Sequence, residues 1–206
     1  PFLLTGSSNT LYSADSIIIA TGASAKWLGL SNEEKYRGHG VSACATCDAF
    51  FFKNKTVAVV GGGNTAVEEA LFLTKFAKKV ILIHRKGILR AEKILQERAF
   101  QNEKISFIWD SVITDIIGEE NPKLVKTIKV KSLTKNIESD INIDGLFVAI
   151  GHKPNTDLFA NKLDSQRSIS IKYKKVKNAD HFFTNQLETV NKEIKKYVFK
   201  RLEKDT

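Results

Sequence analysis

Two cysteines and an aspartate are the residues best suited to chemistry in this sequence, within the run Cys44-Ala45-Thr46-Cys47-Asp48. Thiols at C-x-x-C spacing can close a small disulfide, and a local helix N-terminus commonly stabilises the first thiolate, so the pair suits reversible two-electron exchange. Asp48 could donate a proton if burial raised its pKa. Two alternatives stay open: a buried structural pair, and half of a zinc site that would need histidine ligands, because no second C-x-x-C exists. We expect redox exchange and no metal.

A glycine-rich stretch is the second candidate, Gly61-Gly62-Gly63-Asn64-Thr65-Ala66, which fits G-x-G-x-x-A. Gly61 would allow a tight turn, Gly63 would let the backbone approach a pyrophosphate, and Ala66 would keep a helix close to a strand. The N-terminus of that helix would supply free N–H groups and a partial positive charge. The stretch predicts a dinucleotide site. The alternative is a glycine-rich turn required only for packing.

The choice of dinucleotide depends on the end of the next strand, where NAD sites usually carry an acid. That place holds His84-Arg85-Lys86, with Arg90 one turn later. Cations with several donors would bind the 2′-phosphate of NADP, and arginine suits bidentate contact. We therefore expect NADP(H) rather than NAD(H). These cations could instead be ordinary surface charge, with Glu92 pairing one of them.

Hydrophobic patterning supplies the elements that would position these groups. Apolar runs rich in β-branched residues predict buried strands, and residues 67–77 show helical periodicity between two of them. This strand–helix–strand unit should be parallel with a right-handed crossover. The fold class is therefore α/β, a Rossmann-type parallel sheet with a small antiparallel sheet. The expected elements are strands at residues 16–22, 56–60, 80–83, 105–109 and 146–151, helices at 67–77 and 91–100, and an antiparallel meander over 112–143.

Composition narrows the class of protein. The chain has 206 residues, of which 42% are hydrophobic and 27% charged, enough for one or two globular domains. No apolar run approaches the roughly 18 to 20 residues of a membrane span, so we expect no membrane association. The net charge is +9, and 11 basic against 6 acidic side chains place +5 of it in residues 164–206. No nucleic-acid-binding motif accompanies this charge, so we expect no nucleic acid partner.

The last forty residues differ from the rest of the chain. Apolar residues become rarer and lysine becomes more frequent. Near the C-terminus, one stripe of apolar residues predicts an amphipathic helix, which would need a partner surface to be stable. The stripe consists of Leu187, Val190, Ile194, Val198 and Leu202. The sequence contains no methionine, so we expect a processed chain or a fragment.

Taken together, these motifs resemble bacterial thioredoxin reductases of the low-molecular-weight type. The resemblance covers roughly residues 11–163 and also includes the runs 19–23, 90–93 and 145–155. It implies a cytoplasmic homodimeric flavoprotein in which an NADPH domain is inserted into an FAD domain. It further implies that hydride passes from NADPH to FAD, and that electrons then pass to the cysteine disulfide and to thioredoxin.

The resemblance also implies roles and boundaries. Cys47 would lie nearer the flavin, Cys44 would attack the thioredoxin disulfide, and Asp48 would be the acid. Residues 1–27 would be part of the FAD domain, residues 28–153 the NADPH domain, and residues 154–206 a divergent basic segment. Further cofactor-binding positions would be Thr21, Gly22, Ile150 and Gly151.

The sequence departs from the family pattern at both FAD motifs. The glycine motif for the FAD pyrophosphate would lie before Pro1, and residues 165–206, where a Gly-Asp motif is expected, contain no glycine. Ala49 and Lys86 replace the usual glycine and arginine. The alternative to an active reductase is therefore a truncated remnant that at most binds NADPH; a genuinely divergent C-terminus also stays open.

Overall fold

The computed structural model describes residues 2–157 together with Glu188 and Lys192, and the chain divides into two units, residues 1–157 and 158–206. The first unit carries every element named below. The amphipathic helix predicted for residues 187–202 lies outside the described residues, except that Glu188 and Lys192 are helical and exposed. None of the described helices is long and apolar enough to cross a bilayer.

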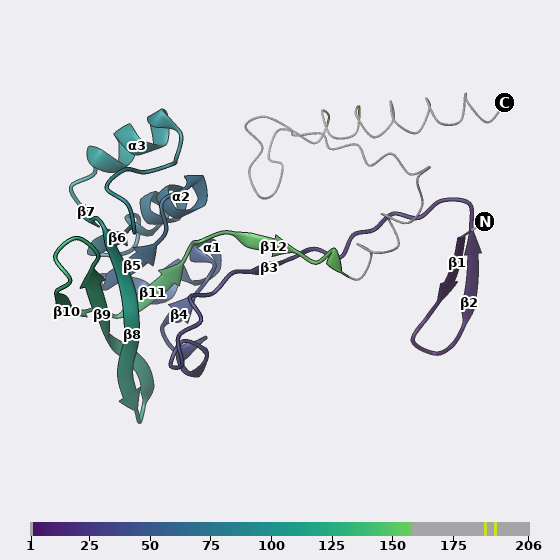
Figure 1. Ribbon diagram of the computed structural model, residues 1–206, viewed down its shortest axis with the longest axis horizontal. Helices are drawn as coiled ribbons and strands as arrows, with labels where there is room; N and C mark the ends of the chain where they lie inside the picture. The colour runs from purple at the N-terminus through teal and green to yellow at the C-terminus, as the bar shows by residue number, and fades with distance from the viewer. Residues whose placement is uncertain (1, 158–187, 189–191, 193–206) are drawn as a thin grey trace. The chain divides into compact units, whose positions relative to one another are not determined.

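A five-stranded parallel sheet forms the centre of the first unit (Figure 1). Its strands alternate between two cores: Val57 and Val59 face one core, whereas Ala58 and Val60 face the other. Because both faces are covered, the strands are continuous apolar runs, as is typical of parallel sheets. In spatial order the strands are β4 (Val41–Ser42), β11 (Gly145–Val148), β5 (Thr56–Val60), β6 (Lys79–Ile83) and β7 (Ile105–Ile108).

Helices cover one face of this sheet. Small residues such as Ala66 and Ala70 let α2 pack closely on β5 and β6, with Leu73 filling the same core. The helical elements are η1 (Glu34–Tyr36), α1 (Ala45–Asp48), η2 (Ala49–Phe52), α2 (Asn64–Leu73) and α3 (Lys93–Phe100). Of these, α1, η2, α2 and α3 contribute to the core on this face, whereas Tyr36 of η1 belongs to the core on the other face.

An antiparallel sheet covers the opposite face, so the domain has three layers (Figure 1). Ile116 and Ile128 pack from this sheet against Ile81 and Ile83 of β6. Its strands are β8 (Ser111–Glu120), β9 (Lys123–Ser132) and β10 (Glu138–Asn142), in the order β10-β9-β8. The predicted α/β class, parallel sheet and antiparallel meander are confirmed.

Two further strand pairs complete the first unit. A hairpin joins β1 (Phe2–Thr5) to β2 (Leu11–Ala14), and β3 (Ala23–Ala25) pairs antiparallel with β12 (His152–Pro154). The chain therefore enters and leaves the three-layered part through paired strands.

The prediction of a buried strand at residues 16–22 is wrong. This run belongs to no strand, and Ile18 is 91% exposed. A β-strand needs hydrogen-bonded neighbours, and within residues 2–157 no strand pairs with this run. Apolar side chains alone therefore did not make it a strand.

For other elements, the observed ends differ from the predicted ends by a few residues. The helix predicted for residues 67–77 is α2, which begins at Asn64 and ends at Leu73. The strand predicted for residues 146–151 is β11, which ends at Val148, before Gly151 takes a φ of +102°. The residues predicted for binding after this strand therefore lie in a loop.

Candidate functional site

A pocket of about 500 Å³ lies where the parallel strands β11, β5 and β6 end. In open parallel sheets this carboxyl edge is where ligands bind. Segments that follow these three strands, together with residues from β8 and from the chain before β4, form its walls. The lining residues predicted from the sequence are Gly61, Gly62, Gly63, Thr65, His84, Arg85, Arg90, Ile150 and Gly151.

Gly61 makes the tight turn between β5 and α2. Its φ is +150°, and its N–H donates to the Ile83 carbonyl at 3.1 Å. A side-chain carbon here would overlap the Ala149 carbonyl and come within 2.7 Å of the Ala66 Cβ. Gly61 and Ala66 therefore allow the close strand–helix approach that the motif predicts.

Gly63 differs from Gly61 because the space beside its Cα is open. A Cβ at this position would meet no protein atom within 4 Å. Gly63 is also the residue preceding α2, and no side chain caps the helix there. Packing therefore does not require glycine at this position. The open backbone and the free N–H groups of a ten-residue helix suit a phosphate.

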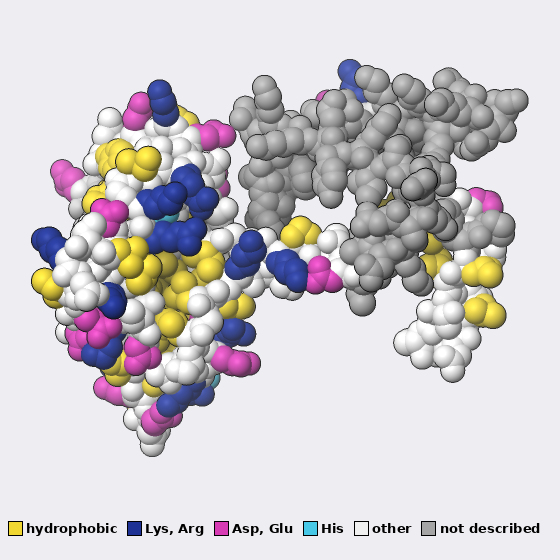
Figure 2. All heavy atoms as spheres, viewed as in Figure 1, with side chains coloured by type: hydrophobic (Ala, Val, Ile, Leu, Met, Phe, Trp, Pro, Cys, Tyr) yellow, Lys and Arg dark blue, Asp and Glu magenta, His cyan; other side chains and the backbone are white. Residues whose placement is uncertain are grey.

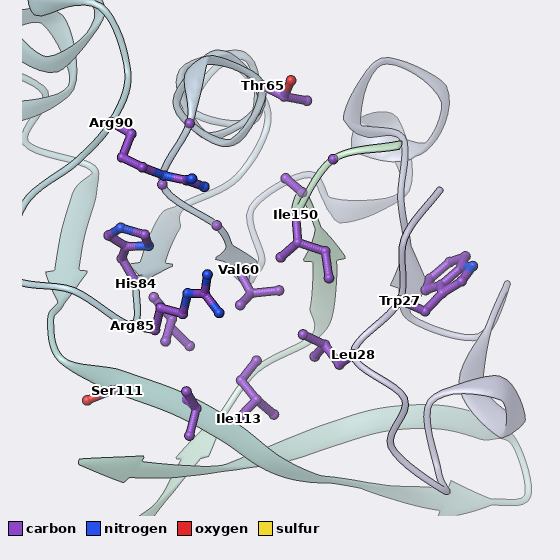
Figure 3. A pocket seen from close by; sticks show the side chains of 17 residues that line it. Trp27, Leu28, Val60, Thr65, His84, Arg85, Arg90, Ser111, Ile113 and Ile150 are labelled. Carbon is purple, nitrogen blue, oxygen red and sulfur yellow. The ribbon is translucent and has the colours of Figure 1, made fainter. Parts of the chain in front are cut away.

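Cationic side chains form one side of the pocket. Arg85 and Arg90 both line it, and His84 lies between them in the view of Figure 3. His84 is 4% exposed, and burial, followed by the charges of Arg90 and Arg85, lowers its pKa, so the imidazole is neutral at pH 7. The two guanidinium groups are thus the lasting positive charges of the pocket lining.

His84 and Arg90 also hold the glycine loop in place at Gly62. Its ring occupies the space that a Cβ at Gly62 would take, while the Arg90 N–H donates to the Gly62 carbonyl at 2.7 Å. The His84 Nε2 atom is buried and has no hydrogen-bond partner in the structure. An unpaired buried donor or acceptor beside a pocket fits a polar ligand that could supply the partner.

Apolar side chains form the rest of the pocket. Trp27, Leu28 and Ile150 lie across from the cations, and Ile113 of β8 lies below (Figure 3). Sequence reasoning identified only Ile150 in this group. The others come from segments far from the glycine motif, and no local pattern marks them. Ser111 and Val112 were missed for the same reason.

Several predicted cofactor-binding residues lie outside the pocket lining. Asn64 accepts a hydrogen bond from the Glu92 N–H at 2.8 Å, Ala66 is fully buried, and Lys86 is exposed. Thr21 and Gly22 are held by Asn155 instead: the Thr21 hydroxyl donates to the Asn155 carbonyl at 2.7 Å, and the Asn155 N–H donates to the Gly22 carbonyl at 3.0 Å. The last two residues thus belong to the strand connection beside β3 and β12.

Cys44 and Cys47 form a disulfide across the short helix α1. Cys44 is the residue preceding the helix; its N–H is held by the Ser42 hydroxyl at 3.0 Å, and its Sγ lies 3.4 Å from the Thr46 hydroxyl. Cys47 is exposed, whereas Cys44 and Asp48 are half-buried. The helix N-terminus expected beside the first sulfur is therefore present, and it favours a thiolate after reduction.

Two exposed aromatic rings follow the disulfide. Phe50 and Phe51 in η2 are 71% and 69% exposed and meet edge to face. Neighbouring Phe52 is instead buried against Phe147. Exposed phenylalanines beside an accessible sulfur offer an apolar contact area for another protein.

The surface of the three-layered part also combines charged and hydrophobic side chains. Figure 2 shows Lys and Arg side chains gathered beside hydrophobic ones on the visible face of the three-layered part.

Within residues 2–157, no three His, Cys, Asp or Glu side chains come together as a group that could hold a metal ion. Both cysteines are engaged in the disulfide.

Among curated proteins, the sequence is similar to thioredoxin reductases. It is 58% identical to that of Rickettsia bellii over 163 residues, 79% of this chain and 53% of that protein. It is 56% identical to that of Rickettsia conorii over 164 residues, again 79% and 53%, and 51% identical to that of Coxiella burnetii over 167 residues, 80% and 51%. The chain thus spans about half the length of the curated relatives it matches.

Solved structures give the same likeness. The thioredoxin reductase of Lactococcus lactis matches with a TM-score of 0.70 and 41% identity, covering 75% of this chain and 50% of that one. The enzyme from Streptococcus pyogenes matches with a TM-score of 0.68 and 44% identity, covering the same shares. Residues 3–199 match the family described as pyridine nucleotide-disulphide oxidoreductase. This match covers more than half of the chain, and the chain therefore belongs to the pyridine nucleotide-disulphide oxidoreductase family.

Proposed function

We propose that this chain carries the NADPH-binding and disulfide-bearing part of an FAD-dependent thioredoxin reductase. The observation that carries the proposal is the position of α2. Its N-terminus opens onto the nucleotide pocket, and its body packs against α1, the helix that carries the disulfide. One helix therefore connects a pyridine nucleotide site to a redox pair.

The pocket offers a group suited to each part of NADPH. When bound, it would supply hydride as a reductant. The N-terminus of α2 and the open backbone of Gly63 would hold the pyrophosphate. Arg85 and Arg90 would bind the 2′-phosphate, since guanidinium groups make strong paired contacts to phosphate oxygens. Trp27 and Leu28 would exclude water from the apolar side.

FAD enters the proposal through the family. A flavin would relay electrons from a hydride donor to a disulfide. The residues that the resemblance proposes for cofactor binding, Thr21 and Gly22, are engaged with Asn155. We therefore derive no step through FAD from the residues of this chain.

Thioredoxin is the proposed partner of the disulfide. Electrons leave a reduced pair through a thiolate that attacks a partner disulfide, in the role proposed for Cys44, while Cys47 would lie nearer the flavin. Asp48, the last residue of α1, is near enough in sequence to supply the proton. The rings of Phe50 and Phe51 would contact apolar surface on thioredoxin.

The domain limits remain part of the proposal. Pairing of β3 with β12 supports an NADPH domain of about residues 28–153, joined to flanking segments 1–27 and 154–206 at this two-stranded connection. The homodimer and the cytoplasmic location implied by the resemblance also stay predictions.

A second candidate is an NADPH-binding protein without turnover, which the engagement of Thr21 and Gly22 with Asn155 supports. Incubation with excess FAD, desalting and an absorbance spectrum separate the two. A reductase retains flavin absorbance that bleaches when NADPH is added without oxygen. A colourless protein that NADPH still protects against thermal unfolding would establish the second candidate instead.

A further inference from the structure

Glu33 is a buried carboxyl that the proposed nucleotide site does not use directly. The residue is 1% exposed, and no other acidic residue among residues 2–157 is as deeply buried. Its neighbour Glu34 is exposed. Glutamate is almost never fully buried unless its oxygens have partners, so the contacts of this side chain show what it does.

Both oxygens of the Glu33 carboxyl accept hydrogen bonds from adjacent backbone groups. The Leu28 N–H donates to Oε1 at 2.9 Å, and the Gly29 N–H donates to Oε2 at 2.9 Å. Gly29 has a φ of +79°, in the left-handed region, which is typical of turns where successive N–H groups converge on an anionic group. The carboxyl therefore fixes the backbone of residues 28 and 29.

The two residues before this turn are held as well. The Lys26 N–H donates to the Gly151 carbonyl at 2.9 Å. The Arg37 guanidinium carbon lies 3.9 Å from the centre of the Trp27 ring, within the range of a cation–π contact. Each residue of the segment 26–29 thus has a contact that fixes it, and Glu33 supplies two of them.

The segment held in this way forms the apolar side of the nucleotide pocket. Trp27 and Leu28 line the pocket across from Arg85 and Arg90 (Figure 3). With the 2′-phosphate at the guanidinium groups and the pyrophosphate at the N-terminus of α2, the nicotinamide half of NADPH extends toward the opposite, apolar side. The reduced nicotinamide ring is uncharged, and apolar side chains suit it.

We propose that Glu33 is a positioning residue for the nicotinamide half of NADPH. Its carboxyl fixes the segment 26–29, so that Trp27 and Leu28 are in place before the ring arrives. Without the two hydrogen bonds, the segment would have to be ordered during binding, which weakens affinity. The inference rests on the proposed function, because it takes NADPH as the ligand.

The test compares Glu33→Gln with the unaltered chain by calorimetric titration. The ligands are NADPH and adenosine 2′,5′-bisphosphate, a fragment that carries the 2′-phosphate but no nicotinamide. Glutamine keeps the shape but turns one acceptor into a donor that faces a backbone N–H, so NADPH binding should weaken about tenfold and bisphosphate binding less than about twofold. The fluorescence of the bound nicotinamide should also fall, because the ring is less shielded from water.

Two other variants complete the design. Glu34→Gln removes the same charge from the adjacent, exposed glutamate and is the matched control; it should change the affinity for either ligand less than about twofold. Glu33→Asp keeps both acceptors on a side chain that is one methylene shorter, so it should weaken NADPH binding only about threefold. This milder variant keeps the proposal testable if Glu33→Gln does not fold.

Four results would overturn the proposal. Equal losses for NADPH and the bisphosphate would mean that Glu33 supports the whole domain rather than the nicotinamide half. Unchanged NADPH affinity in Glu33→Gln, or an equal effect of Glu34→Gln, would remove the buried carboxyl from the explanation. In these three cases the unaltered chain still binds NADPH, so the proposed nucleotide site stands. An unaltered chain that binds neither ligand would overturn the proposed site and this inference together.

Discussion

Replacing Glu69 by glutamine should make the folded chain more stable at high pH and leave it unchanged at low pH. Burial raises the folded-state pKa of this carboxyl from 4.5 to about 7, so the folded protein holds the proton more tightly than the unfolded chain. Stability therefore falls as pH rises from about 4.5 through about 7, where the carboxyl must ionise in its buried site. Glutamine keeps the shape and removes this titration.

The size of the effect follows from the same pKa. At about 1.36 kcal/mol per pKa unit, the ionised carboxyl costs at most about 3 kcal/mol above pH 7. Because the side chain is only half-buried, solvent screening reduces the expected gain to about 1 to 2 kcal/mol. For a chain of 206 residues this corresponds to a rise in Tm of roughly 3 to 6 °C.

Thermal unfolding followed by circular dichroism at pH 4.5 and pH 8, with the disulfide intact, measures this difference. The Tm values of the two proteins should agree at pH 4.5 and separate at pH 8, with Glu69→Gln the higher. Glu68→Gln controls for the loss of one negative charge on the same helix. If Glu69→Gln changed Tm equally at both pH values, the raised pKa would not be the cause, and the reasoning would be wrong.

Three further predictions concern the pocket and the partner surface. Arg85→Ala combined with Arg90→Ala should weaken NADPH binding by more than about 100-fold, since each charged hydrogen bond contributes about 1.5 to 3 kcal/mol, and NADH binding less than about fivefold; equal losses in calorimetry would exclude a 2′-phosphate site. Gly61→Ala should lower Tm by about 5 to 10 °C because of overlap with Ala149, whereas Gly63→Ala, which meets no protein atom, should keep Tm and weaken NADPH; a normal Tm for the first would contradict the packing. Phe51→Ser should slow exchange of the reduced pair with oxidised thioredoxin about tenfold but not with dithiothreitol, and equal rates with thioredoxin would remove Phe51 from the docking surface.

Local sequence was sufficient for the centre of the fold. Residues 56–60 and 80–83 are unbroken apolar runs bounded by turns, and such runs become parallel strands when both of their faces are covered. The glycine motif sits between them because a turn this tight leaves room for no side chain at Gly61. The motif, its helix and the cations at the end of β6 could therefore be predicted together.

The failure at residues 16–22 shows the limit of this reasoning. The run has the same β-branched composition as β5, yet Ile18 is almost fully exposed. Composition describes what a strand can bury, whereas pairing depends on which other segment lies alongside. That information is not contained in the run itself.

The sequence by itself determined the chemistry: a disulfide pair at C-x-x-C spacing, a glycine loop opening a helix, and arginines after the next strand. Only the tertiary structure decided which residues line the pocket together, because Trp27, Leu28 and Ile113 reach it from segments distant in the chain. It also decided which of two adjacent glutamates is half-buried. Glu68 and Glu69 are identical in type, and only the packing of α2 half-buries one side chain and leaves the other in solvent.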